Sequence, residues 1–182
     1  MKLTAFARAR HGLLVLAASL GLVFGLSASP AQAAATASAS GNWIVAFKAN
    51  HSGKCLEVAD WSTANGAAVR QWTCTGGANQ QWEQIPSNYP GEYYYRNVHS
   101  GKCMEIGGWG TNNGATANQW DCHWGLNQLF VTGGAKIVMD FWYTQNKCLE
   151  IADWRRDNGA PARLWDCHTG DNQSFTMELL SW

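Results

Sequence analysis

The chain has 182 residues, with 13 basic and 13 acidic side chains and therefore a formal net charge of zero at neutral pH. It has no basic patch or basic run, which argues against nucleic acid as the main partner. No segment after the N-terminal region has the length and hydrophobicity of a transmembrane helix.

The N-terminal region has the organisation of an export signal. A basic start (Lys2, Arg8 and Arg10) precedes an apolar run over residues 13–26, which ends in the small-x-small pattern Ala31-Gln32-Ala33. This pattern predicts a signal peptide over residues 1–33, because the run is short for a membrane anchor. Residues 34–42 are predicted to form a flexible leader. Removal of residues 1–33 leaves a mature chain of 149 residues with a net charge of −3, enough for one compact domain.

The remaining chain repeats itself three times. The first copy reads "KCLEVADWSTANGAAVRQWTCTGGANQQW" over residues 54–82, and copies in the same register occupy residues 102–130 and 147–175. The first cysteines of the copies are 48 and then 45 residues apart. Such a period predicts three similar units that cannot each bury a core alone. The predicted repeats cover approximately residues 43–88, 89–134 and 135–182.

Each unit has the signals of β-structure. In the first unit the apolar segments 55–58, 67–72 and 79–85 predict short strands, and the Asn65-Gly66 turn separates two of them. Asn-Gly pairs recur at matching places in the other two units. No segment of the mature chain shows a sustained 3.6-residue apolar period. The spacing of the strands predicts an all-β barrel or sandwich.

Six cysteines lie in the predicted mature chain. An even number in an exported chain favours disulfide bridges, and the absence of a Cys-x-x-Cys pair gives no indication of a metal or redox site. One bridge within each unit is the pairing that follows the repeat. Each bridge would close a loop of about 20 residues and contribute roughly 3 kcal/mol. The predicted bridges are Cys55–Cys74, Cys103–Cys122 and Cys148–Cys167.

The bridges also predict which side chains lie opposite one another. If bridged cysteines face each other directly on antiparallel strands, then Glu57 faces Trp72 on the same side of the hairpin, with Cβ atoms about 5 Å apart. Leu56 and Val58 then point into the core. An acid beside an aromatic ring suits a sugar, since the ring accepts the C–H face and the carboxylate accepts hydroxyl protons. The equivalent pairs are Glu105 with Trp120 and Glu150 with Trp165.

Two further groups recur in each unit. Asn79, Asn127 and Asn172 offer an amide that both donates and accepts hydrogen bonds. A second tryptophan lies in each hairpin loop and is predicted to form a wall of the pocket: Trp61, Trp109 and Trp154.

Two other functions were weighed against sugar binding. Glu57 with Asp60, and the equivalent pair in the third unit, resemble the carboxylate pairs of glycosidases, but Gly108 breaks this pattern in the middle unit. Three near-equivalent pockets favour a binding protein over an enzyme. A domain that binds protein, such as a protease inhibitor with degenerate sugar sites, is the alternative, because residues 87–95 ("SNYPGEYYY") form the least repeated stretch.

The three phrases resemble those of the ricin-type lectins and of related carbohydrate-binding modules. The resemblance covers about residues 43–180 and includes the family's Gln-x-Trp signature, seen here as Gln80-x-Trp82, Gln128-x-Phe130 and Gln173-x-Phe175. It implies a β-trefoil with three-fold pseudosymmetry, in which the aromatic residue of this signature belongs to the core. It also implies that the sugar contacts are the acid, the aromatic residue before the second cysteine, the asparagine, and a polar residue two positions before the aromatic. These are Glu57, Arg70, Trp72 and Asn79; Glu105, Asn118, Trp120 and Asn127; and Glu150, Arg163, Trp165 and Asn172.

The acid departs from the family pattern. The family usually has Asp at this position, whereas all three units here have Glu. The additional methylene moves the carboxylate outward by about one bond length, a distance that hydrogen bonds do not tolerate without rearrangement. Either the pocket is reshaped around a different sugar, or direct binding is impaired.

The sequence therefore predicts a secreted, disulfide-bridged, monomeric β-trefoil lectin without catalytic activity. Up to three shallow pockets would bind oligo- or polysaccharides. No metal or organic cofactor, no nucleic acid and no membrane insertion after signal cleavage is expected.

Overall fold

The computed structural model describes residues 42–139 and 146–182, which belong to one compact unit, Ser38–Trp182. The predicted signal peptide, 1–33, and all but the last residue of the predicted leader, 34–42, lie outside the described residues. Within the described ranges no helix has the length and apolar character needed to cross a membrane.

The described residues form twelve strands and six short 3-10 turns, with four strands in each repeat. The first repeat contains β1 (Trp43–Ala49), β2 (Cys55–Val58), β3 (Val69–Trp72) and β4 (Trp82–Pro86). The second contains β5 (Glu92–Asn97), β6 (Cys103–Ile106), β7 (Ala117–Trp120) and β8 (Phe130–Gly133). The third contains β9 (Lys136–Met139), β10 (Lys147–Ile151), β11 (Ala162–Asp166) and β12 (Phe175–Ser181).

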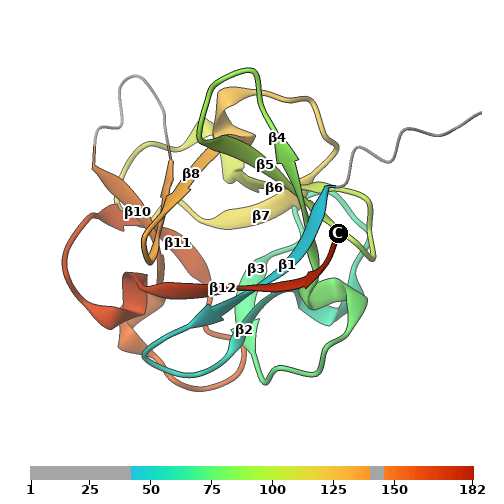
Figure 1. The fold of residues 1–182 in the computed structure, drawn as a ribbon. Helices are drawn as coiled ribbons and strands as arrows, with labels where there is room; N and C mark the ends of the chain where they lie inside the picture. Colours follow the sequence, from blue (N-terminus) through green and yellow to red (C-terminus); the bar gives the residue numbers. More distant parts are fainter. Residues whose placement is uncertain (1–41, 140–145) are drawn as a thin grey trace, which may run out of the picture. The chain divides into compact units, whose positions relative to one another are not determined.

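The strands pair in an antiparallel, three-fold pattern. β1 pairs with β4, β4 with β5, β5 with β8, and β8 with β9, while the last strand, β12, returns to pair with β1 (Figure 1). The inner strands of each repeat form the separate hairpins β2–β3, β6–β7 and β10–β11. This arrangement confirms the predicted β-trefoil.

Alternating side chains on these strands build one core. Leu56 and Val58 of β2 are fully buried, as predicted. The aromatic residues of the Gln-x-Trp signature, Trp82, Phe130 and Phe175, are at most 3% exposed and lie in the same cluster. β4 begins later than predicted, because Asn79 and Gln80 form a 3-10 turn, η2 (Ala78–Gln80), ahead of it.

The three predicted disulfide bridges are confirmed. Cys55–Cys74, Cys103–Cys122 and Cys148–Cys167 each join residues 19 positions apart, with Cα–Cα distances of 5.0–5.1 Å. Each bridge closes the hairpin of one repeat on itself. The covalent restraint is therefore local, and contacts between repeats must come from hydrogen bonds and packing.

The Asn-Gly turns supply many of these contacts between repeats. The Gly66 N–H donates to the Gln119 carbonyl of the second repeat at 2.8 Å, and the Asn65 amide donates to Asp121 at 2.8 Å. The pattern recurs between the second and third repeats, where Asn113 donates to the carboxylate of Asp166 at the end of β11. Gly66, with φ of +82°, adopts a conformation that favours glycine. The sequence-local turns thus fix how neighbouring hairpins meet.

The aspartates in these contacts titrate below their usual range. The Asn65 hydrogen bond and Lys102 lower the pKa of Asp121, while Lys147 and then the equivalent asparagine lower the pKa of Asp166. Because the folded pKa lies below the ordinary value of 3.8, the unfolded chain binds more protons between these values. The contribution of these two carboxylates to the free energy of unfolding is therefore fully present above the unfolded pKa. It is lost as the pH falls through the folded pKa.

We expect the melting temperature to decrease as the pH falls through the ordinary aspartate pKa of 3.8 towards the lowered pKa values of Asp121 and Asp166. In the variant Asp121→Asn/Asp166→Asn the decrease should be smaller, because neither side chain titrates. Thermal unfolding followed by circular dichroism measures this, with Glu178→Gln as an exposed control. An unchanged pH dependence in the double variant would show that these contacts do not couple folding to protonation.

Candidate functional site

The predicted binding residues of the first repeat lie around one shallow pocket. It has a volume of about 180 Å³. Glu57 comes from β2, Arg70 and Trp72 from β3, and Asn79 from η2, while Trp61 comes from the hairpin turn η1 (Ala59–Trp61). The complete lining is Glu57, Asp60, Trp61, Arg70, Trp72, Thr75 and Asn79. Residues from four elements, β2, η1, β3 and η2, thus meet at one place.

The register of the hairpin differs from the prediction. Cys55 lies opposite Trp72, and Glu57 lies opposite Arg70, so the prediction that Glu57 directly faces Trp72 is wrong. The chain leaves the strand pairing at Thr73, whose N–H bonds to Asn158 of the third repeat at 2.9 Å. The second cysteine then bridges to the first from beyond the end of the strand.

The other hairpins share this register, with Glu105 opposite Asn118 and Glu150 opposite Arg163, so the predicted facing of each acid with Trp120 or Trp165 is also wrong. Acid and indole still share a face of the hairpin, because residues two apart on a strand point the same way. They are diagonal neighbours, and the polar residue stands directly opposite the acid.

The three glutamates are buried within hydrogen-bond networks. Glu57 is 4% exposed. Its Oε1 accepts from Arg70 Nε at 3.0 Å, and its Oε2 accepts from the amides of Asn79 and Gln80, both at 3.2 Å. Glu150 has the equivalent three donors in the third repeat. Most of the carboxylate's accepting capacity is therefore used within the protein.

An arginine covers the tryptophan in two of the three repeats. The Arg70 guanidinium lies 4.5 Å from the centre of the Trp72 ring, and Arg163 lies 4.6 Å from that of Trp165. Arg70 also pairs with Asp60 at 2.8 Å, so one cation joins the two carboxylates that were considered for catalysis. For Arg163, burial lowers the pKa of the guanidinium, but hydrogen bonds to the equivalent acids outweigh burial and raise it. Both arginines are thus held in place by charge and by stacking.

The second repeat has a different pocket surface. Asn118 replaces the arginine, Gly108 replaces the exposed aspartate, and Trp120 is 41% exposed. His123 approaches Glu105 with an Nε2–Oε2 distance of 3.4 Å. The site therefore carries one carboxylate and a more open indole, whereas the first and third sites each carry two carboxylates and an arginine.

Histidines add to the second and third sites. Nδ1 of His168 accepts from the Gly170 N–H at 3.0 Å, which leaves the proton of a neutral ring on Nε2, and Nε2 lies 3.6 Å from Glu150. The His168 ring stacks with Trp154 at 6.3 Å between centroids, as His123 does with Trp109 at 6.0 Å. In the first repeat Thr75 takes this position.

The loop tryptophans lie in backbone conformations that are unfavourable for their type. Trp61 has φ of +54°, as does Asp60 before it, and Trp109 and Trp154 have φ of +57° and +56°. Each is about half exposed. Trp61 packs so closely on Gly77 that a Cβ there would lie 2.7 Å from the indole. Such strain in an exposed aromatic loop is typical of binding sites, and Trp61 lines the pocket of the first repeat.

Each site contains a buried acceptor without a protein partner. The amide nitrogen of Asn79 donates to Glu57 and to the Val58 carbonyl, but within residues 42–139 and 146–182 its Oδ1 has no hydrogen-bond partner. The same holds for Oδ1 of Asn127 and Asn172. Buried polar atoms usually find partners, so three equivalent exceptions call for an explanation.

The glutamines of the Gln-x-Trp signature were not predicted to belong to the sites. Gln80 accepts from the Thr75 N–H at 2.8 Å and donates to the Thr73 carbonyl at 2.9 Å, besides its bond to Glu57. It thereby ties the segment after β3 to the acid. The recurrence of a glutamine beside the asparagine in all three units is the signal that could have revealed it.

The family follows from sequence comparison. The sequence pattern described as "Ricin-type beta-trefoil lectin domain-like" matches residues 32–120, and the pattern described as "Ricin-type beta-trefoil lectin domain" matches residues 91–179. The designed three-fold symmetric protein ThreeFoil is 31% identical, with a TM-score of 0.69 over 75% of this chain and 99% of that one. The chain belongs to the ricin-type β-trefoil lectin family. This membership supports a carbohydrate-binding role.

Other solved structures share the fold. An exo-β-1,3-galactanase from Clostridium thermocellum is 25% identical, with a TM-score of 0.69, and the match covers 76% of this chain but 30% of the galactanase. The C-terminal half of an earthworm R-type lectin in complex with GalNAc is 19% identical, with a TM-score of 0.60 over 76% of this chain and 99% of that one. The comparison with curated protein sequences gives no match.

Proposed function

We propose that the chain is a secreted lectin that binds glycans through the three repeat pockets and has no catalytic activity of its own. The observation that carries the proposal is the pocket of the first repeat. There Trp61 supplies an apolar face beside the Trp72 indole, which Arg70 covers on one side. Arg70, Asp60 and Thr75 supply donors and acceptors. A pyranose ring has this combination of apolar C–H faces and hydroxyl groups.

The unpartnered asparagine oxygens support the same function. A ligand hydroxyl that reached Oδ1 of Asn79 would complete its hydrogen bonding, and the equivalent atoms offer this in the other two repeats. The buried glutamate acts mainly by orienting the asparagine and the arginine. Under this proposal the longer side chain of Glu, in place of the family's usual Asp, reaches protein donors.

The size of the pocket indicates weak binding at each site. About 180 Å³ is below the roughly 300–1,000 Å³ of pockets that take drug-sized ligands, so one sugar unit is the expected occupant. Millimolar affinity corresponds to about 4 kcal/mol. Several sites on one polymer raise the apparent affinity through effective concentration, so a polysaccharide is the preferred partner.

We expect the wild-type protein to bind on a glycan array and to be retarded in native gels that contain β-1,3-galactan, galactomannan, xylan or β-1,3-glucan. The substitutions Trp72→Ala, Trp120→Ala and Trp165→Ala should reduce retardation stepwise, with the triple variant showing almost none. Trp182→Ala, at an 86% exposed position, is the control. Full retardation of a folded triple variant would exclude these pockets.

A further inference from the structure

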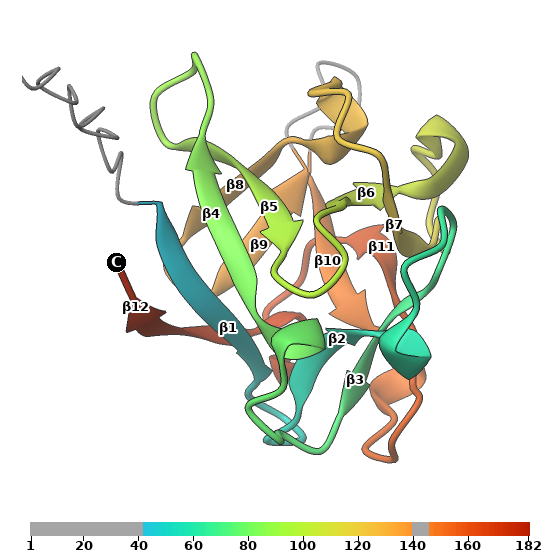
Figure 2. The same cartoon turned by 90° about the vertical axis from the view of Figure 1, so that its right-hand side faces the viewer.

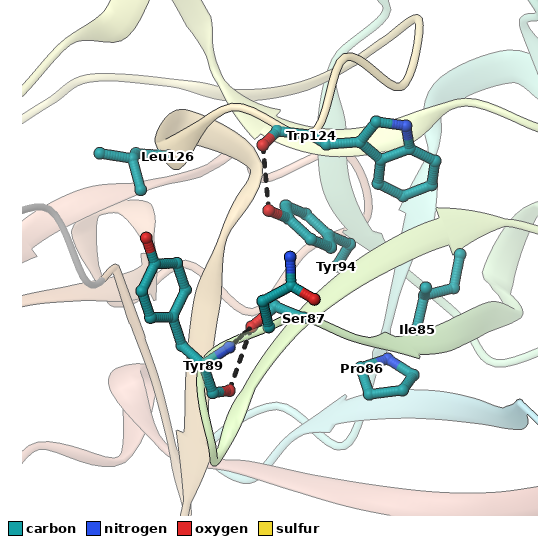
Figure 3. Close-up of a pocket in the computed structure, with 8 residues that line it drawn as sticks. Ile85, Pro86, Ser87, Tyr89, Tyr94, Trp124 and Leu126 are labelled. Atoms are coloured by element: carbon teal, nitrogen blue, oxygen red, sulfur yellow. Dashed lines mark hydrogen bonds between the residues drawn. The ribbon is translucent and has the colours of Figure 1, made fainter.

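A second type of pocket lies apart from the three repeat sites. It has a volume of about 560 Å³, three times that of the first repeat pocket. Its walls come from the end of β4, the connection to β5, and the segment before η4 (Leu126–Gln128) (Figure 3). It is lined by Ile85, Pro86, Ser87, Asn88, Tyr89, Tyr94, Trp124 and Leu126.

The pocket depends on a local departure from three-fold symmetry. The β4–β5 connection has five residues, 87–91, whereas the equivalent β8–β9 connection has two, 134–135. Counted between paired residues, Trp82 to Asn97 spans 15 positions whereas Phe130 to Met139 spans nine, so the β4–β5 hairpin is the longer of the two. The longer connection projects beyond the strands (Figure 2). It is part of the stretch "SNYPGEYYY" that sequence analysis identified as the least repeated.

Trp124 has a strained backbone that its packing does not explain. It is 47% exposed and has φ of +59°, in the left-handed region. The equivalent position in the first repeat is Gly76, whose φ of +71° is natural for glycine. A half-exposed tryptophan gains little burial there, while its left-handed backbone is unfavourable for any residue with a Cβ. Ligand contact accounts for such a residue.

The aromatic wall is held in place before any ligand arrives. The Tyr94 hydroxyl donates to the Trp124 carbonyl at 3.0 Å, and the two rings meet edge to face at 5.1 Å between centroids (Figure 3). Burial is the main cause that raises the pKa of the Tyr94 hydroxyl, which keeps it a donor at neutral pH. Rigid aromatic surfaces bind with a small loss of conformational entropy.

The opposite wall is also preorganised. Ser87 Oγ accepts from the Tyr89 N–H at 2.9 Å and donates to the Tyr89 carbonyl at 3.1 Å (Figure 3). The Ser87 N–H bonds to the Glu92 carbonyl at 3.0 Å, which closes the loop at its base. Tyr89, 48% exposed, is therefore presented on an ordered turn.

The lining indicates the chemistry of the ligand. None of the eight lining residues carries a charge, which excludes the ion pairs that phosphate, carboxylate or sialic acid groups require. Aromatic rings beside hydroxyl and amide groups suit an uncharged sugar. The pocket also lies next to the second repeat site. Along the chain, its residues Trp124 and Leu126 lie between His123 and Asn127, which both contact Glu105.

We propose that this pocket is an accessory subsite for an uncharged sugar unit of a glycan that the second repeat also binds. The proposal rests on the proposed lectin function and extends it, because it makes the second repeat select a longer, neutral glycan. The first and third repeats lack an equivalent of this aromatic pair: Gly76 and Thr169 occupy the position of Trp124.

The test uses Trp124→Gly combined with Tyr89→Ala in the full chain. Trp124→Gly copies the first repeat and relieves the left-handed strain, so the melting temperature should stay the same or increase. In native gels containing β-1,3-galactan, galactomannan, xylan or β-1,3-glucan, the double variant should bind the retained polysaccharides about five-fold more weakly. Trp182→Ala should not change retention.

The outcomes separate the two proposals. If the double variant keeps wild-type retention while the triple variant of the repeat tryptophans loses it, the accessory subsite is excluded and the lectin function stands. If none of the four polysaccharides retards the wild-type protein, both proposals fail. If a proline-rich decapeptide shifts the indole NMR signal of Trp124 and oligosaccharides of the retained polysaccharides do not, the pocket is a peptide site and the proposal is overturned.

Discussion

Reduction of the three disulfide bridges is expected to unfold the protein at room temperature. Each bridge closes a loop between residues 19 positions apart, and opening it gives the unfolded chain about 3 kcal/mol of additional conformational freedom in the chain-entropy model. The three loops do not overlap along the chain, so the effects should add to about 9 kcal/mol. This is comparable to the whole stability of a typical domain, about 5–15 kcal/mol.

Tryptophan fluorescence and near-ultraviolet circular dichroism measure this unfolding. On addition of dithiothreitol, the emission should shift to the red because Trp82 leaves the core, where it is fully buried. Variants that lack one bridge, such as Cys103→Ser/Cys122→Ser, should remain folded and lose about 3 kcal/mol each. A fully reduced chain that kept its near-ultraviolet spectrum would show that packing between repeats alone holds the trefoil.

Replacing the buried glutamates by glutamine should have unequal effects in the three repeats. In the first repeat both carboxylate oxygens accept hydrogen bonds, Oε1 from Arg70 and Oε2 from Asn79 and Gln80. Glutamine has one accepting oxygen, so its amide nitrogen must face another donor, and the charge partner of Arg70 is lost. We expect Glu57→Gln and Glu150→Gln to cost about 2–3 kcal/mol each.

The second repeat provides the matched control. In the part of the chain that the structure describes, all hydrogen bonds to the Glu105 carboxylate end on Oε2. A glutamine can place its oxygen there and its nitrogen at the other position, so Glu105→Gln should cost less than about 1 kcal/mol. Urea denaturation gives these free energies of unfolding. If the three Glu→Gln variants lost the same free energy of unfolding, the arginine of the first and third repeats would not strengthen the network around the glutamate, contrary to the expectation.

These variants also separate two roles of the acid. If the carboxylate mainly orients its neighbours, the variants that lose more stability should also lose more polysaccharide retention. Both losses should then be larger in the first and third repeats. A Glu57→Gln variant with wild-type stability and no binding by the first repeat would indicate that the acid accepts directly from sugar hydroxyls.

The presence or absence of an arginine divides the three repeat sites into two chemical types. The first and third pockets hold an arginine between two acids and over an indole. The second has a neutral asparagine there, an indole that is 41% exposed, and the larger aromatic pocket beside it. The three repeats are therefore expected to differ in sugar preference although their strands have the same arrangement.

The sequence by itself determined the three-fold repeat, the strands, the turns and the disulfide pairing. All of these depend on interactions that are local or that the repeat copies: Asn65-Gly66 sets a turn wherever it occurs, and Cys55 and Cys74 lie within one hairpin. The predicted side chains of the first pocket, Glu57, Arg70, Trp72 and Asn79, also lie together, because they flank that same hairpin.

Only the tertiary structure decided the register within the hairpin and the hydrogen-bond partners of the acid. Thr73 leaves the ladder because Asn158, in another repeat, takes its N–H, and no pattern within one unit encodes that contact. The resulting two-residue shift sets Arg70 opposite Glu57, where the two side chains form an ion pair. The aromatic pocket around Trp124 likewise exists only because the β4–β5 connection folds beside a segment about 35 residues further along the chain, a proximity that requires the closed trefoil.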